Sequence, residues 1–181
     1  MKFISLIAEH RGSFYSLERV TGSLICLRSP KKQTSNFSPK LKSALSLCEN
    51  PYLLESKTGT AFDDSNHAKE SRVARCFIRL SRMSFWAACR YASLGRPKWA
   101  DAAEAIVAFR NQTAGFDQNV LCLPRALFAA RMSKKFAEKG VVLIGAFLPS
   151  RSLHAWILED ALQPDPRDRQ WINFQPVAAI Y

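Results

Sequence analysis

The pattern of hydrophobic and polar positions divides the chain into a short β-rich part and a longer mixed part. In the first part, three short apolar runs cover residues 2–9, 14–20 and 23–28. Turn sequences that contain Gly12 and Gly22 separate these runs. Short runs with partial alternation and glycine turns between them predict a meander of three strands.

A helix is predicted after this small sheet, and a linker after the helix. Apolar residues from Leu41 to Cys48 recur at the spacing of one helix face. Ser38 followed by Pro39 is a favourable helix start, because serine caps free N–H groups and proline fits the first turn. Residues 58–71 are polar, rich in Thr, Ser, Asn and Asp, and without periodicity. Such a stretch is typical of a linker.

The remaining chain is predicted to combine helices with an antiparallel sheet. Three segments have the apolar spacing of amphipathic helices: residues 70–95, 98–112 and 122–139. Apolar segments over residues 141–149 and 153–159 predict strands, and residues 171–181 predict another strand or a peptide-contacting tail. The predicted fold class is therefore α+β, with a β-rich module over residues 1–57, a linker over 58–71 and a second domain over 72–181.

Composition and charge narrow the function classes. Apolar residues make up 48% of the chain, which is ordinary for a globular protein. The net charge of +11 favours an acidic partner, but the basic residues are spread along the chain and do not predict a dedicated nucleic-acid binder. No window approaches the roughly 18 apolar residues of a membrane span, and the N-terminus lacks a signal-peptide pattern. We therefore expect a cytoplasmic protein without membrane contact.

The cysteines favour free thiols. Five cysteines are present at irregular spacing: Cys26, Cys48, Cys76, Cys89 and Cys122. An odd number without any Cys-x-x-Cys pair predicts neither a disulfide framework nor a structural zinc site. Free thiols are typical of a reducing compartment. No metal and no cofactor are expected in this chain.

One stretch, residues 121–165, holds the residue types of a thiol-nucleophile site. Cys122 stands at the start of a predicted helix, where unpaired N–H groups and the helix dipole favour a thiolate. His154 follows on a predicted strand, and Asp165 lies between two prolines. A histidine activates a thiol, and a carboxylate fixes the imidazole tautomer. An inert buried thiol and a structural histidine are the alternatives.

The sequence around Cys122 and His154 resembles a known family. The run CLPRAL at Cys122, a helix closed by Gly140, the run LIGA and the run HAW at His154 are similar to the transglutaminase-like B proteins of lasso-peptide biosynthesis. These proteins are cysteine peptidases that remove the leader from ribosomally made precursors. The similarity is strongest over residues 119–181.

The resemblance implies roles for three residues of the site. Cys122 would be the nucleophile, His154 the general base and Asp165 the orienting acid. The family's aspartate lies one residue farther from the histidine, so Asp165 requires a one-residue gap. Asp160 and Asp168 therefore remain alternatives for the third role.

The resemblance also implies an architecture and partners. Residues 1–57 would form a winged-helix-like module that binds the leader as an added strand, and residues 72–181 a transglutaminase/papain-like cysteine protease domain. A hairpin that covers the protease domain and a DNA-binding winged helix are the alternatives for the module. The expected partners are the precursor peptide and a separate ATP-dependent cyclase. Any dependence on ATP would come through this cyclase.

Two other functions remain open at this point. A transamidase of the same fold would let an amine, not water, resolve the acyl-enzyme, and the product mass distinguishes the two. A non-catalytic peptide-binding maturation protein would hold Cys122 as an unreactive thiol, and thiol reactivity distinguishes that case.

Overall fold

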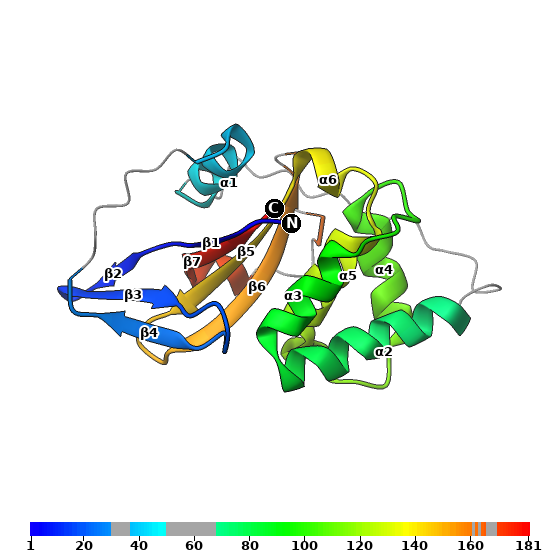
Figure 1. Ribbon diagram of the computed structural model, residues 1–181, viewed down its shortest axis with the longest axis horizontal. Helices are drawn as coiled ribbons and strands as arrows, with labels where there is room; N and C mark the ends of the chain where they lie inside the picture. Colours follow the sequence, from blue (N-terminus) through cyan, green and yellow to red (C-terminus); the bar gives the residue numbers. More distant parts are fainter. Residues whose placement is uncertain (30–36, 50–67, 161, 163, 166–169) are drawn as a thin grey trace.

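The computed structural model describes residues 1–29, 37–49, 68–160, 162, 164–165 and 170–181 (Figure 1). The described strands are β1 (Phe3–Ser5), β2 (Ala8–His10), β3 (Ser13–Leu17), β4 (Leu24–Leu27), β5 (Gly140–Phe147), β6 (Ser152–Glu159) and β7 (Gln175–Ile180). The described helices are α1 (Pro39–Glu49), α2 (Ala68–Met83), α3 (Phe85–Ser93), α4 (Ala102–Gln112), α5 (Cys122–Met132) and α6 (Phe136–Lys139), with 3₁₀ helices η2 (Gln118–Leu121) and η3 (Gln170–Asn173). The predicted α+β class is confirmed.

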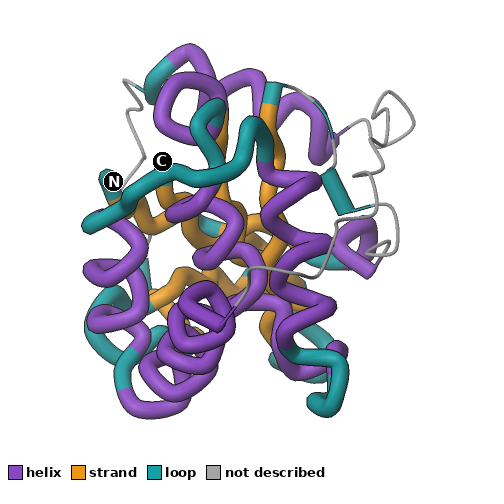
Figure 2. Tube along the Cα trace, turned by 90° about the vertical axis from the view of Figure 1, so that its right-hand side faces the viewer, coloured by secondary structure: helices purple, strands orange, loops and turns teal. Residues whose placement is uncertain are grey.

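The strands form two antiparallel sheets. A four-stranded sheet has the order β1-β7-β5-β6, and a three-stranded sheet has the order β2-β3-β4. The strands predicted over residues 141–149 and 153–159 form a hairpin, since β5 and β6 pair antiparallel from Gly140↔Glu159 to Phe147↔Ser152. Figure 2 shows the helices in front of the strands, with the two chain ends close together.

Helices pack on both faces of the four-stranded sheet. Alternation along β6 decides which residue meets which layer. Ala155 and Ile157 belong to the core formed with α2, α3, α4 and α5. Trp156 and Leu158 belong to a second core under α1. These two pairs therefore lie on opposite faces of the sheet.

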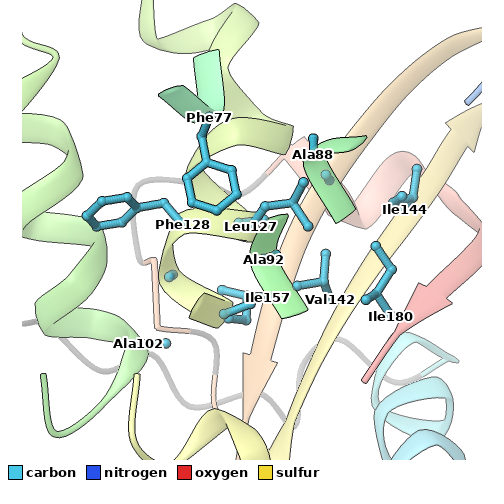
Figure 3. Packing of buried hydrophobic residues seen from close by; sticks show 14 of the residues in the cluster. Phe77, Ala88, Ala92, Ala102, Leu127, Phe128, Val142, Ile144, Ile157 and Ile180 are labelled. Carbon is cyan, nitrogen blue, oxygen red and sulfur yellow. The ribbon is translucent and has the colours of Figure 1, made fainter. Parts of the chain in front are cut away.

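The larger core fixes α5 against the sheet (Figure 3). Leu127 and Phe128 of α5 are fully buried. Phe128 meets Phe77 of α2 edge to face, with ring centroids 6.2 Å apart. Burial of side chains of this size contributes about 1.5–3 kcal/mol each. The start of α5, where Cys122 lies, is thus held rigidly beside β6.

The N-terminal segment is arranged differently from the prediction of one strand over residues 2–9. The segment forms two strands, and β1 pairs with the C-terminal strand β7, with Phe3 opposite Ile180. The N–H of Leu6 donates to the carbonyl of Val177 at 2.8 Å before the chain turns into β2 of the other sheet. Local alternation predicts a strand but not its partner, which here lies at the other end of the chain.

Serine residues interrupt two of the predicted helices. Ser84 has extended backbone angles, and its hydroxyl accepts from the N–H of Ala87 at 3.2 Å, so that a new helix starts after it. Ser133 ends α5, and its hydroxyl donates to Glu159 on β6 at 2.5 Å. Both serines form hydrogen bonds at helix ends, Ser84 with a backbone N–H and Ser133 with a carboxylate. A continuous helix would not allow these bonds.

Parts of the predicted linker and one site candidate lie outside the described residues. These parts are residues 58–67 of the linker and Asp168. Residues 68–71 belong to the first turn of α2. Within the described part of the chain, no helix has the length and hydrophobicity that crossing a membrane requires.

Candidate active site

Cys122 lies at the first position of α5, directly after η2. The carboxylate of Asp117 accepts from the N–H of Asn119 at 3.0 Å and starts η2. No side chain caps the start of α5. The half-buried thiol of Cys122 therefore lies at a helix start, as the sequence predicts.

The thiol of Cys122 hydrogen bonds with His154 of β6. Burial by itself raises the pKa of the thiol. Three neighbours act against burial: His154 through its hydrogen bond and its charge, Ala155 through its N–H, and Arg125 through its charge. Together they outweigh burial, so the pKa of Cys122 lies below the usual value of 9.0. The structure thus brings the predicted nucleophile and the predicted base together.

Aromatic rings fix the imidazole of His154, which is buried. Trp156 stacks with it at 6.2 Å between ring centroids, and Phe174 lies at 5.2 Å. Gly145 is the residue of β5 that pairs with His154. A Cβ at Gly145 would lie 2.8 Å from atoms of both Phe174 and Trp156, so the absence of a side chain lets these rings approach.

Asp165 lies in the same region of the molecule and is buried. Both of its carboxylate oxygens accept from Nη2 of Arg110 at 2.8 Å. Nε of Arg125 lies 3.0 Å from Oδ2 of Asp165. Arg125 is on α5, about one turn from Cys122. Asp165 therefore ties the segment after β6 to both α4 and α5. The contact with α5 lies near the helix end that carries the thiol of Cys122.

The alternative candidate Asp160 lies elsewhere. Asp160 follows the last residue of β6, and the strand between His154 and Glu159 is extended over roughly 16 Å. Its carboxylate pairs with Nζ of Lys139 at 2.9 Å, and both side chains are about half exposed. Asp160 is therefore too far from the imidazole to orient it, and the interpretation that kept it in this role was wrong.

Arg110, Gly145 and Phe174 are parts of the site that sequence reasoning missed. Arg110 follows the buried Phe109 and stands four residues after the buried Ile106 on α4. A basic residue at the spacing of the buried face was the available signal for an internal ion pair. No comparable local pattern marks Gly145 or Phe174, because they meet His154 from distant parts of the chain, Gly145 from β5 and Phe174 from the residue before β7.

No family model, no curated protein and no solved structure matches this chain. Within the described residues, no group of three or more His, Cys, Asp or Glu side chains could hold a metal ion. The function therefore has to be inferred from the geometry of the site and from its chemistry.

Proposed function

We propose that this chain is a cysteine peptidase that forms an acyl-enzyme on Cys122. One observation carries the proposal: the thiol at the start of α5 hydrogen bonds with His154, and its pKa is lowered despite burial. A thiolate beside an imidazole is the arrangement that nucleophilic cysteine catalysis requires. The packing of α5 and β6 in one core supports it, because fixed positions reduce the cost of reaching the reactive geometry.

The proposed reaction has two halves. The Cys122 sulfur attacks the carbonyl carbon of the scissile amide, and backbone N–H groups near the start of α5 are the proposed donors to the resulting oxyanion. The imidazolium of His154 then gives its proton to the amide nitrogen, the C–N bond breaks, and the amine leaves. Water attacks the thioester, His154 takes a proton from that water, and the thiolate leaves as the acid is released. Asp165, held by Arg110 and Arg125, is the proposed orienting acid.

The proposed substrate is the leader region of a ribosomally made lasso-peptide precursor. The similarity of CLPRAL and HAW to the transglutaminase-like leader peptidases supports this substrate class. A cysteine on a helix start beside a strand histidine fits the proposed transglutaminase/papain-like arrangement. A separate ATP-dependent cyclase is the proposed partner that closes the ring on the released core.

The three-stranded sheet is the proposed site of leader recognition. In the winged-helix-like module of the proposal, the leader adds as a strand at the edge of this sheet. The strand β4 lies at one edge of the order β2-β3-β4, and its Ile25 and Cys26 are exposed. An exposed edge strand offers main-chain groups for pairing.

Mass spectrometry of a co-expressed precursor tests the function. Wild type and Cys122→Ala are compared, each with and without the cyclase. We expect a leader-sized fragment with wild type only. Equal cleavage by both proteins would contradict the role of Cys122 and favour a non-catalytic binding protein. A crosslinked product without leader release would favour a transamidase.

A further inference from the structure

A groove lies where β1 and β7 separate under the C-terminal half of α1. Its volume is about 510 Å³. Leu6 and Ile7 line it from the segment that follows β1, and Gln175 and Pro176 from the start of β7. Cavities of roughly 300–1,000 Å³ are typical of sites for small ligands or side chains. Two other hollows in the described structure measure about 80 and 200 Å³.

This groove shares a wall with the candidate active site. Phe174 lines the groove, and the same ring lies 5.2 Å from the ring of His154. Phe147 of β5 extends the aromatic surface, with its ring 6.1 Å from that of Phe174. A peptide with its scissile carbonyl at Cys122 can therefore place a neighbouring side chain on the other side of Phe174.

The lining of the groove selects an apolar occupant. Seven of its side chains are apolar: Leu6, Ile7, Phe37, Leu45, Ile172, Phe174 and Pro176. Ile172 at the rim is 53% exposed, so an apolar partner would remove its surface from water. Glu49 is the charged residue among the lining side chains, and its carboxylate disfavours an acidic occupant.

We propose that this groove is the subsite that binds an apolar or aromatic side chain of the peptide substrate, within two residues of the bond that Cys122 attacks. The proposal rests on the proposed function, since it assigns a specificity pocket to that same site. Phe174 separates the bound side chain from His154. The subsite would favour phenylalanine or leucine and reject aspartate.

Peptidyl chloromethyl ketones test the subsite without knowledge of the precursor. In this reaction the Cys122 thiolate displaces chloride from the methylene carbon and forms a thioether. The probes are acetyl dipeptides Ala-Ala, Phe-Ala, Ala-Phe, Asp-Ala and Ala-Asp. Alkylation of Cys122 is followed by peptide mass mapping, with Cys122→Ala as the blank. Cys48, which lines the groove, has its pKa raised to about 12, chiefly by burial, and stays a thiol.

One of the two phenylalanine probes is expected to alkylate Cys122 about 10- to 100-fold faster than Ala-Ala. The aspartate probe of the same position is expected to be no faster than Ala-Ala. Ile172→Glu places a charge at the rim and should reduce the Phe-over-Ala ratio about tenfold. Leu94→Glu is the matched control, because Leu94 is also an exposed apolar residue but lies at the end of α3.

The outcomes separate the two proposals. If iodoacetamide fails to alkylate Cys122 at neutral pH, the proposed function and its subsite both fail. If iodoacetamide alkylates Cys122 but all five dipeptide probes react at similar rates, the subsite alone is overturned. The subsite is also overturned if Ile172→Glu and Leu94→Glu keep the same Phe-over-Ala ratio as wild type.

Discussion

At the scale of single residues, the reactivity of Cys122 depends on the imidazole beside it. The hydrogen bond and charge of His154 act against burial, which alone would raise the pKa of the thiol. His154→Phe keeps a ring between Trp156 and Phe174 but removes the nitrogen atoms. We expect the pH midpoint of Cys122 alkylation by iodoacetamide to lie below 9.0 in wild type and to rise in the variant. The rate at neutral pH should fall roughly tenfold for each unit of that rise. An unchanged midpoint would contradict the pairing.

The missing side chain of Gly145 also matters at the scale of single residues, because two aromatic rings pack against this position. An added Cβ would stand 2.8 Å from Phe174 and Trp156, which both contact His154. Gly145→Ala should therefore lower the free energy of unfolding by about 1–3 kcal/mol, because the packed rings must shift. Gly115→Ala is the control, since nothing lies within 4 Å of its added Cβ. Urea unfolding of both variants measures the difference, and equal losses would refute the close approach.

At the scale of secondary-structure elements, Asp165 joins α4 and α5 through two arginines. Asp165→Asn leaves the guanidinium groups of Arg110 and Arg125 without this anion in a buried place. We expect a loss of about 3 kcal/mol in the free energy of unfolding. Asp160→Asn breaks a half-exposed pair with Lys139 and should cost less than about 1 kcal/mol. Thermal and urea unfolding compare the two, and a similar cost for both would contradict the buried ion pair.

Glu159 joins the end of β6 to two helices. Its carboxylate accepts from the N–H of Ala102 at 2.9 Å and from the hydroxyl of Ser133. Burial outweighs these bonds and raises the pKa of Glu159 above its usual 4.5. The folded state therefore holds the proton more tightly than the unfolded chain does. The stability from this proton is fully present below pH 4.5 and is lost as the pH rises through the folded pKa.

Glu159→Gln should remove this loss. The glutamine oxygen can still accept from Ala102, and its amide group can donate to the Ser133 hydroxyl. From pH 4.5 upward, the free energy of unfolding of wild type should fall relative to that of the variant. Urea unfolding at several pH values gives both curves. Parallel curves would show that Glu159 is not the group responsible.

The sequence predicts those elements whose signals are local. Helix spacing and the run before Cys122 place the thiol at a helix start, and alternation along β6 places His154 beside Trp156. Ser84 breaks one predicted helix through a local cap on the N–H of Ala87, whereas Ser133 breaks another because it bonds Glu159, which only the folded chain brings near. Arg110 was missed for the same reason, since its partner Asp165 is 55 residues away in the sequence.

At the scale of the whole molecule, the two ends of the chain build one sheet. The N–H of Tyr181 donates to the carbonyl of Lys2 at 3.0 Å, and β1 pairs with β7. Phe3 also meets Phe85 of α3, with ring centroids 5.8 Å apart. Leu41 of α1 is fully buried in the second core, on the other face of this sheet. Residues from the expected N-terminal module therefore cover an edge and a face of the sheet that carries His154.

This arrangement predicts that the second domain is not stable alone. A fragment of residues 68–181 keeps α2 through β7 but loses β1 at the edge of β7 and α1 over the second core. An uncovered edge strand and an apolar face favour aggregation. We expect the fragment to unfold at a lower temperature than the full chain, or to aggregate. Addition of residues 1–57 as a separate peptide should restore part of the difference, because β1 and α1 can dock again. Cooperative unfolding of the fragment at the temperature of the full chain would instead show that β1 and α1 contribute little to the sheet around His154.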